Sequence, residues 1–297
     1  MNKRAFILGL ITVTFWGSGF AAIRAGLLGG FTAGHLMVYR YIIASFVFLL
    51  YALFSKSKFT LPDKKDLLPI FILGVVGITF YHFGVTFGQV TVSAGTTSMI
   101  VGSAPIFTTL IAVFILREKM DVIGWIGLGF GFIGVALITI GSSGASFTFS
   151  TGLFLVFFAT ISTSFFFVFQ KSLLTKYHPI HLAAYFTWAG TIPMLIFVPG
   201  LGETLQNATL EANLAAIYVG IFPAALCYAT WAMALSLGDV SSISSMLYLE
   251  PPIAIVVAWI WLSELPSVLS MVGGFIAISS VAIVNFIGRR KQKIPSS

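Results

Sequence analysis

Long apolar stretches alternate with short polar segments along the whole chain. Ten of these stretches are long enough to cross a membrane as helices, because a helix rises about 1.5 Å per residue and a bilayer core is about 30 Å thick. Strands of a membrane barrel need only about 10 residues of alternating polarity, whereas these stretches are longer and apolar throughout. The pattern therefore predicts an all-α integral membrane protein with ten transmembrane helices. The predicted helices cover residues 5–25, 34–54, 67–87, 95–116, 121–141, 150–171, 180–199, 213–236, 241–262 and 267–288.

The first stretch, 5–25, follows the basic residues Lys3 and Arg4, as the apolar core of a signal peptide would. A signal peptide carries an apolar run of about 7–15 residues, which this stretch exceeds. The stretch also has a counterpart in a sequence repeat described below. We therefore expect it to be retained as the first transmembrane helix.

The composition supports membrane insertion. Hydrophobic residues make up 58% of the chain and charged residues 8%, with a mean hydropathy of +1.02, whereas a soluble domain carries about 25% charged residues. So few charges cannot cover the surface of a soluble fold of this size. The single cysteine, Cys227, excludes an intrachain disulfide and a multi-cysteine metal site. We expect no metal and no cofactor.

Basic residues gather on one predicted side of the membrane. If the N-terminus lies inside, fourteen of the sixteen lysines and arginines fall in inner segments, and only Arg24 and Arg40 do not. Cytoplasmic loops carry an excess of basic residues, so we expect both termini in the cytoplasm of a multi-pass plasma-membrane protein. This placement accounts for the net charge of +7 without a nucleic-acid partner. Arg24 ends the first predicted helix, where we expect it to anchor the helix at the interface.

The sequence repeats itself with an offset of 146 residues. Pro105 then aligns with Pro251, and Glu118 aligns with Glu264. Each copy holds five predicted helices, an odd number, so the second copy enters the membrane inverted relative to the first. Inverted repeats are a recurrent plan of secondary transporters, with the substrate site near the midplane between the copies. The two expected repeats are residues 1–145 with helices 1–5, and residues 146–297 with helices 6–10 and a basic cytoplasmic tail.

Glu250 is the acidic residue predicted to lie deepest in the membrane. It falls about nine residues into its predicted helix, before Pro251, which removes a helix hydrogen-bond donor. Pro105 occupies the same depth in the first copy, so a helix kink is expected in both copies. The carboxylate is present only in the second copy. Intramembrane acids are costly and commonly functional. Glu250 could contact a substrate amine or carry a proton, and the alternative is a structural carboxylate that is protonated or paired.

Arg40 lies six residues into the second predicted helix. At that depth it could snorkel outward, line a water-filled cavity or pair with an acid. His82 follows Tyr81 toward the outer end of the third predicted helix, and Tyr228 stands at the place of His82 in the second copy. A lone membrane histidine serves more often in packing than as a proton relay, so both roles stay open.

Three tryptophans, Trp16, Trp188 and Trp231, lie well inside their predicted helices and not in an interfacial belt. Such rings either pack between helices or line a pocket for an apolar, aromatic or cationic ligand. A different helix carries glycine every three or four residues, which lets helix backbones approach closely. We expect this face to pack within the bundle, and a homodimer interface is the alternative. The glycines are Gly124, Gly127, Gly131 and Gly134.

Several short motifs resemble the EamA-type transporters of the drug/metabolite transporter superfamily. These motifs are Trp16-Gly17-Ser18-Gly19-Phe20, Arg40, Leu116-Arg117-Glu118 after Pro105, Glu250-Pro251 and Ser263-Glu264. The resemblance covers nearly the whole chain. The family often has glycine before the terminal acid of the fourth and ninth helices, where this chain has Arg117 and Ser263. That departure concerns the local geometry of the helix ends.

The resemblance implies ten helices in two inverted repeats and export of small metabolites, often amino acids or their derivatives. We therefore expect a secondary transporter, not an enzyme, that moves a small organic solute outward by alternating access. Its partners are the solute and the lipid bilayer. Transport could be coupled to a proton gradient, or it could be facilitated diffusion without a coupling ion. The candidate cavity residues are Trp16, Ser18, Tyr81, His82, Trp231 and Glu250.

Three other functions are weighed against this one. The same fold could export drug-like or cationic compounds. An intramembrane enzyme would need acids, histidines or metal ligands clustered near one membrane face, and the histidines here are scattered. A non-transporting membrane protein would not need proline kinks at matching depths in both copies. The sequence favours transport over both of the latter.

Overall fold

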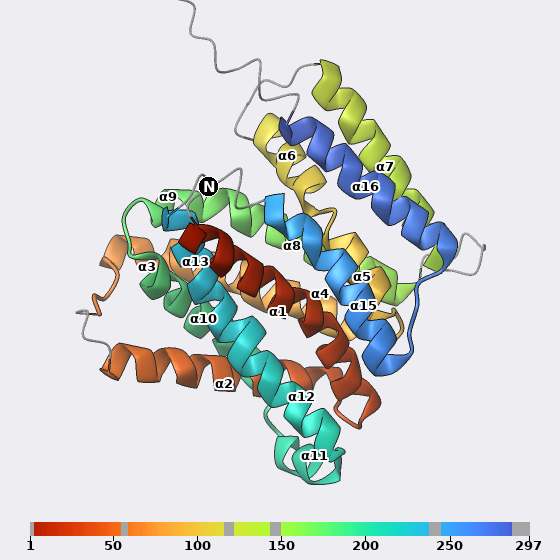
Figure 1. Cartoon of the computed structure of the whole chain (residues 1–297). Coiled ribbons are helices and arrows are strands. Elements are labelled where there is room, and N and C mark those ends of the chain that lie inside the picture. The colour runs from red at the N-terminus through yellow and green to blue at the C-terminus, as the bar shows by residue number, and fades with distance from the viewer. Residues whose placement is uncertain (1–2, 55–58, 116–121, 143–149, 238–244, 287–297) are drawn as a thin grey trace, which may run out of the picture.

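The computed structural model describes residues 3–54, 59–115, 122–142, 150–237 and 245–286. Within these ranges every regular element is a helix and no strand occurs. Figure 1 shows the helices gathered in one bundle, with α7 and α16 lying side by side along one edge. The all-α class predicted from the apolar pattern is therefore confirmed for the described part of the chain.

The first half is built from long helices joined by short connections. Its elements are α1 (Lys3–Leu28), α2 (Ala33–Phe54), η1 (Lys64–Asp66), α3 (Leu67–Gly74), η2 (Val75–Phe80), α4 (Tyr81–Gly88), α5 (Ala94–Val101), α6 (Ala104–Phe114) and α7 (Val122–Ser142). The second half is α8 (Thr151–Phe169), α9 (Lys171–Leu174), α10 (Pro179–Met194), η3 (Leu195–Phe197), α11 (Leu201–Asn207), α12 (Leu210–Ile221), η4 (Phe222–Leu226), α13 (Cys227–Leu237), η5 (Ser245–Leu249), α15 (Glu250–Leu262) and α16 (Val268–Phe286).

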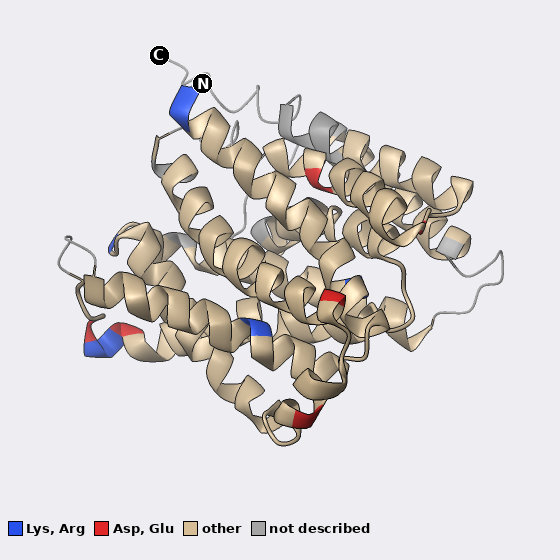
Figure 2. Cartoon of the chain, turned by 60° about the horizontal axis from the view of Figure 1, so that its bottom comes forward, with Lys and Arg blue, Asp and Glu red and all other residues tan. Residues whose placement is uncertain are grey.

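Eight described helical segments are long and apolar enough to cross a membrane. They are Lys3–Leu28, Ala33–Phe54, Lys64–Gly88, Ala94–Ile111, Gly124–Gly141, Thr151–Leu174, Pro179–Phe197 and Leu210–Ala234. Two further apolar helices, Met246–Leu262 and Val268–Ser280, are shorter. Figure 2 shows that charged residues occupy few positions on this bundle. The chain therefore has the character of a multi-pass membrane protein, while the count of ten spans stays a prediction.

Contacts between the halves repeat when the halves are exchanged. The first helix of each half packs on the third and fourth helical segments of the other: α1 on α12, α13 and α15, and α8 on η2, α4 and α6. The finer contacts follow the same rule. A Cβ atom added to Gly220 would lie 2.9 Å from the carbonyl oxygen of Arg40, and one added to Gly74 would lie 2.8 Å from that of Phe186. Because Gly220 and Phe186 lie 146 residues after Gly74 and Arg40, the two contacts are equivalent.

Both halves interrupt the regular α-helix at matching places. The segments η2 and η4 are π-helical, and they end at Phe80 and Leu226, which are equivalent under the 146-residue offset. A second interruption precedes α6 and α15, where Pro105 and Pro251 each take the second position of a new helix. Proline suits the first turn of a helix because its missing N–H would have no partner there. The prolines expected to kink two helices thus stand where α6 and α15 begin.

The glycine face of α7 packs against α16. A Cβ atom added to Gly134 would lie 2.5 Å from the backbone nitrogen of Ala277, and one added to Gly131 would lie 2.7 Å from Ser280 Oγ. A Cβ atom on Gly273 of α16 would lie 2.6 Å from the carbonyl oxygen of Gly134. The backbones of the two helices are therefore in direct contact, as small-residue faces permit. The expectation of packing within the bundle is confirmed at these positions.

Candidate functional site

Arg40 lies in the interior of the bundle on α2. Its side chain is fully buried, and its Nη2 donates hydrogen bonds to Nδ1 of His82 at 2.9 Å and to Oγ1 of Thr86 at 2.8 Å. Both partners belong to α4, which packs against α2. A guanidinium only donates, so Nδ1 of His82 accepts and the ring carries its proton on Nε2. Arg40 therefore neither snorkels to the surface nor forms an ion pair with a described acid.

Several polar atoms around Arg40 have no hydrogen-bond partner within the described residues. They are Nε and Nη1 of Arg40 and Nε2 of His82. The Tyr41 ring lies 5.6 Å from the Arg40 guanidinium carbon and 4.7 Å from the His82 ring. Leaving a buried donor unpartnered costs roughly 1–3 kcal/mol, and more when the donor is charged. We call Arg40, Tyr41, His82 and Thr86 the Arg40 centre.

Glu250 is the first residue of α15 and is half-buried. A carboxylate is favourable at a helix N-terminus, where unpaired N–H groups carry partial positive charge. The Trp16-Gly17-Ser18 motif of α1 packs close to it, because a Cβ atom on Gly17 would lie 2.9 Å from the Glu250 carbonyl oxygen. The two intramembrane charges, Arg40 and Glu250, come one from each half of the chain.

Aromatic rings surround this region from α1 and α13. The Trp16 ring lies 5.4 Å from the Trp231 ring and 5.7 Å from the Tyr228 ring. Its Nε1 donates to the carbonyl oxygen of Pro223 at 3.0 Å, so the π-segment η4 holds the indole in place. Trp16 and Trp231 are half-buried, as are Tyr81 and His82. These rings are thus neither sealed in the core nor fully on the surface.

The structure brings some of the candidate cavity residues together. The Trp16 and Trp231 rings lie 5.4 Å apart, and Glu250 packs against Gly17, the residue after Trp16. Tyr81 meets its sequence neighbour His82 edge-on at 4.5 Å. Ser18 differs, because its hydroxyl is already bonded to Tyr218 at 2.6 Å.

Sequence reasoning missed Tyr41, Thr86 and the bond between Arg40 and His82. A signal for that bond was present. Arg40 follows the start of its predicted helix by six residues, and His82 precedes the end of its own by five, at the same side of the membrane.

Arg24 takes part in an ion pair between the halves, beyond the anchoring role expected of it. Its Nε lies 2.9 Å from Glu264 Oε1, and its Nη1 donates to the carbonyl oxygens of Gln89 at 2.6 Å and Val90 at 3.0 Å. Both paired side chains are mostly buried, at 17% and 21% exposure. The ion pair joins the end of α1 to the segment after α15 and to the end of α4. We call this region the Arg24 end of the bundle.

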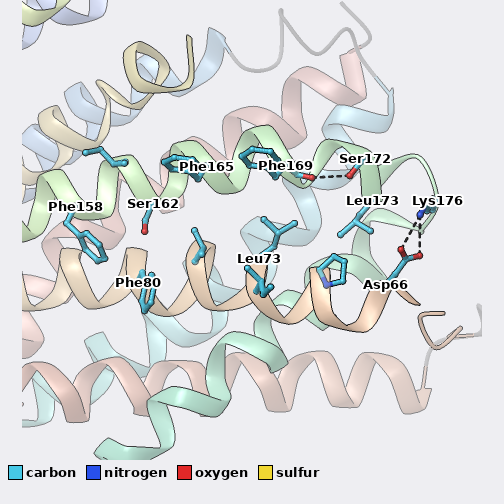
Figure 3. Close-up of a pocket in the computed structure, with 14 residues that line it drawn as sticks. Asp66, Leu73, Phe80, Phe158, Ser162, Phe165, Phe169, Ser172, Leu173 and Lys176 are labelled. Atoms are coloured by element: carbon cyan, nitrogen blue, oxygen red, sulfur yellow. Dashed lines mark hydrogen bonds and ion pairs between the residues drawn. The ribbon is translucent and has the colours of Figure 1, made fainter. Parts of the chain in front are cut away.

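A cavity of about 590 Å³ lies between α8 and the α3–η2 segment, as Figure 3 shows. Its walls are mainly apolar, and Asp66 and Lys176 lie at one end, paired at 3.1 Å. Asp66 also accepts a hydrogen bond from the Tyr177 hydroxyl at 2.7 Å, which raises the pKa of Tyr177. None of the candidate cavity residues lines this space.

Comparison with known proteins decides the family. The sequence pattern of the EamA-like transporter family matches residues 3–140 and again residues 150–286. The chain belongs to the EamA-like transporter family. This EamA protein is a membrane transporter by descent and carries two copies of the family domain. The resemblance seen in the motifs is confirmed.

Relatives of this EamA protein are named as transporters or exporters. An uncharacterized transporter, YdfC, of Bacillus subtilis is 36% identical over 99% of this chain and 93% of its own length. A probable terminal-alkyne amino-acid exporter of Streptantibioticus cattleyicolor is 33% identical over 98% of this chain and 97% of its own. One crystal structure aligns with 99% of this chain and 100% of its own at a TM-score of 0.66 and 16% identity. At that identity the likeness concerns the fold alone.

Proposed function

We propose that this EamA protein exports small organic metabolites, most closely amino acids or related compounds, across the plasma membrane by alternating access. The observation that carries the proposal is a pair of opposite intramembrane charges, one from each half of the chain. Arg40 comes from the first half and Glu250 from the second. Buried ionisable groups at this depth commonly mark a substrate path. A relative named as a probable amino-acid exporter supports the choice of substrate class.

The mechanism follows from the position of the site between the halves. In inverted-repeat transporters, the substrate site lies near the midplane and the two repeats rock about it. The helix interruptions before α6 and α15, with Glu250 at one of them, fit such a site. With both termini in the cytoplasm, the Arg24 end faces outward and must open to release the solute. The Glu250 carboxylate is the group that would carry a coupled proton.

Export is tested by reconstitution in liposomes. Vesicles are preloaded with labelled amino acids, nucleosides or cationic drugs, and efflux is followed with and without a pH gradient. We expect efflux of at least one amino acid and a loss of about tenfold or more in Glu250→Gln, because the amide cannot carry the charge that one half contributes. Glu203→Gln, which changes an exposed glutamate outside the site, is the matched control and retains efflux.

Each outcome of this experiment is decisive for one part of the proposal. Full efflux in Glu250→Gln, with unchanged pH dependence, would remove Glu250 from substrate contact and from proton coupling. If the efflux rate of the wild type is the same with and without a pH gradient, the transport mechanism is facilitated diffusion. No efflux of any member of the panel would contradict the export proposal.

A second substrate class has an observation of its own. Trp16, Tyr228 and Trp231 form an aromatic cluster, and Gly17, next to Trp16, packs against the backbone of Glu250. Aromatic faces together with a carboxylate suit an organic cation. The buried Arg40 charge opposes a substrate that carries only positive charge. Efflux of the cationic drugs without efflux of amino acids would favour this class.

A further inference from the structure

We propose that the Arg40 centre is the binding site for the carboxylate of the substrate. The proposal rests on the function proposed above and assigns one pole of the site to Arg40. Every unpartnered nitrogen in the centre is a donor: Nε and Nη1 of Arg40 and the protonated Nε2 of His82. Such a set of donors lacks an acceptor, and the charged donor lacks an anion.

The protein itself does not supply that anion within the described residues. The ion pairs found there are Arg24 with Glu264, Lys65 with Asp63, and Lys176 with Asp66, all away from Arg40. None of these pairs includes Glu250, so the intramembrane acid does not form an ion pair with Arg40 among the described residues. An isolated buried cation is costly and is normally compensated by a counter-ion. A bound anion would compensate Arg40.

The chemistry of the centre selects a carboxylate. His82 accepts a hydrogen bond from Arg40 and is therefore neutral, so the centre carries a single positive charge. A singly charged carboxylate balances it, whereas a phosphate with nearly two charges would leave one uncompensated. Carboxylates and guanidinium groups also form charge-assisted hydrogen bonds, which are about twice as strong as neutral ones.

The remaining surroundings define the rest of the ligand. Glu250, whose backbone packs against Gly17 next to Trp16, supplies a negative group, which suits an ammonium. Half-buried aromatic rings from Trp16 and Trp231 supply an apolar wall. A molecule with a carboxylate, an ammonium and an apolar side chain satisfies all three, and an apolar L-amino acid has this composition.

The experiment compares acids with their amides. The unfolding midpoint of the purified wild-type protein in detergent is measured with L-leucine and L-phenylalanine, and then with L-leucinamide and L-phenylalaninamide. A ligand that binds only the folded state raises the midpoint. We expect at least one of the two acids to raise it, with its amide about tenfold or more weaker. The N-acetyl derivatives, which lack the ammonium, test the Glu250 pole in the same way.

Variants then assign the effect to Arg40. Arg40→Gln is expected to remove the preference for acid over amide, whereas Lys64→Gln, which removes an exposed positive charge, retains it. If Arg40→Gln does not fold, the comparison of acid and amide in the wild type still decides the proposal. Equal effects of acid and amide, or no effect of either acid, would overturn the carboxylate site. Efflux of another solute in the liposome assay would then leave the transporter function standing, so the two failures are distinguishable.

Discussion

Ser263 has a backbone conformation that suits glycine better than serine. It ends α15 at φ 55° and ψ 24°, in the left-handed region. Its N–H bonds to the carbonyl of Trp259 at 3.1 Å, and the N–H of Glu264 bonds to that of Ala258 at 3.2 Å. The bond from Ser263 to Trp259 is that of the αL ending of a helix, which glycine usually completes. Ser263 stands where the family often has glycine, and its left-handed conformation gives that departure a physical meaning.

We therefore predict that Ser263→Gly stabilises the protein. The left-handed conformation costs a residue with a side chain roughly 1–2 kcal/mol, part of which glycine loses again through the entropy of the unfolded chain. A net gain of about 0.5–1 kcal/mol is expected, measured as a higher midpoint of thermal unfolding in detergent. Ser263→Ala keeps the penalty and is the control. A midpoint for Ser263→Gly equal to that of Ser263→Ala would contradict the assignment.

At the scale of elements, the contact between α7 and α16 depends on glycine. The two backbones touch at Gly134 and Gly273, and a side chain at either position would separate them. Gly129 lies on the same helix α7 but has nothing within 4 Å of an added Cβ atom. The helix thus contains one glycine that permits packing and another that does not take part in it.

This difference predicts opposite effects of the same substitution. Gly134→Ala is expected to destabilise the protein by about 1–3 kcal/mol, because overpacking forces the helices apart. Gly129→Ala is expected to be neutral or to stabilise by up to about 1 kcal/mol, since alanine favours helix more than glycine does. Unfolding midpoints of the two variants, purified in parallel, provide the test. Equal midpoints would mean that α7 and α16 are not in backbone contact in the membrane protein.

For the whole molecule, the Arg24 end is where the two halves are tied by charge. The pair of Arg24 and Glu264 joins α1 to the segment after α15, and Arg24 also bonds to the carbonyl oxygens that follow α4. Outward release, as proposed above, requires this end to open. The ion pair therefore favours the closed arrangement of the halves.

Removing the pair is predicted to increase opening. Cys227 is the single cysteine and is fully buried, so its rate of maleimide labelling reports how often the interior is exposed. A partly exposed ion pair contributes up to about 1 kcal/mol, so Arg24→Gln should raise the labelling rate by up to about fivefold. Arg24→Lys, which keeps the charge, should raise it less. An unchanged rate in Arg24→Gln would show that the pair does not hold the Arg24 end closed.

The features that the sequence predicts are those determined by local hydropathy and by the repeat, whereas features determined by tertiary packing were missed. Hydropathy places the helices, because burial in lipid acts residue by residue, and the 146-residue offset places Pro105 and Pro251 at equivalent helix starts. The bond between Arg40 and His82 could have been found from their equal predicted depth.

The remaining features arise from tertiary packing. The pair of Arg24 and Glu264 joins residues 240 positions apart, and no local pattern indicates it. The π-helical form of η2 and η4 depends on backbone hydrogen bonds that hydropathy does not encode. The cavity beside α8 depends on how side chains from separate helices fill space.

The two π-helical segments have a consequence for the history of the chain. Their sequences, VVGITF and FPAAL, share almost no residues, yet both segments end at the same repeat position. Tyr81 and His82 follow the first segment directly, and Tyr228 follows the second by two residues. A wider turn rotates everything after it about the helix axis, so losing it in one copy would turn those side chains away from the interior. A single ancestral half that already contained the wider turn accounts for both copies.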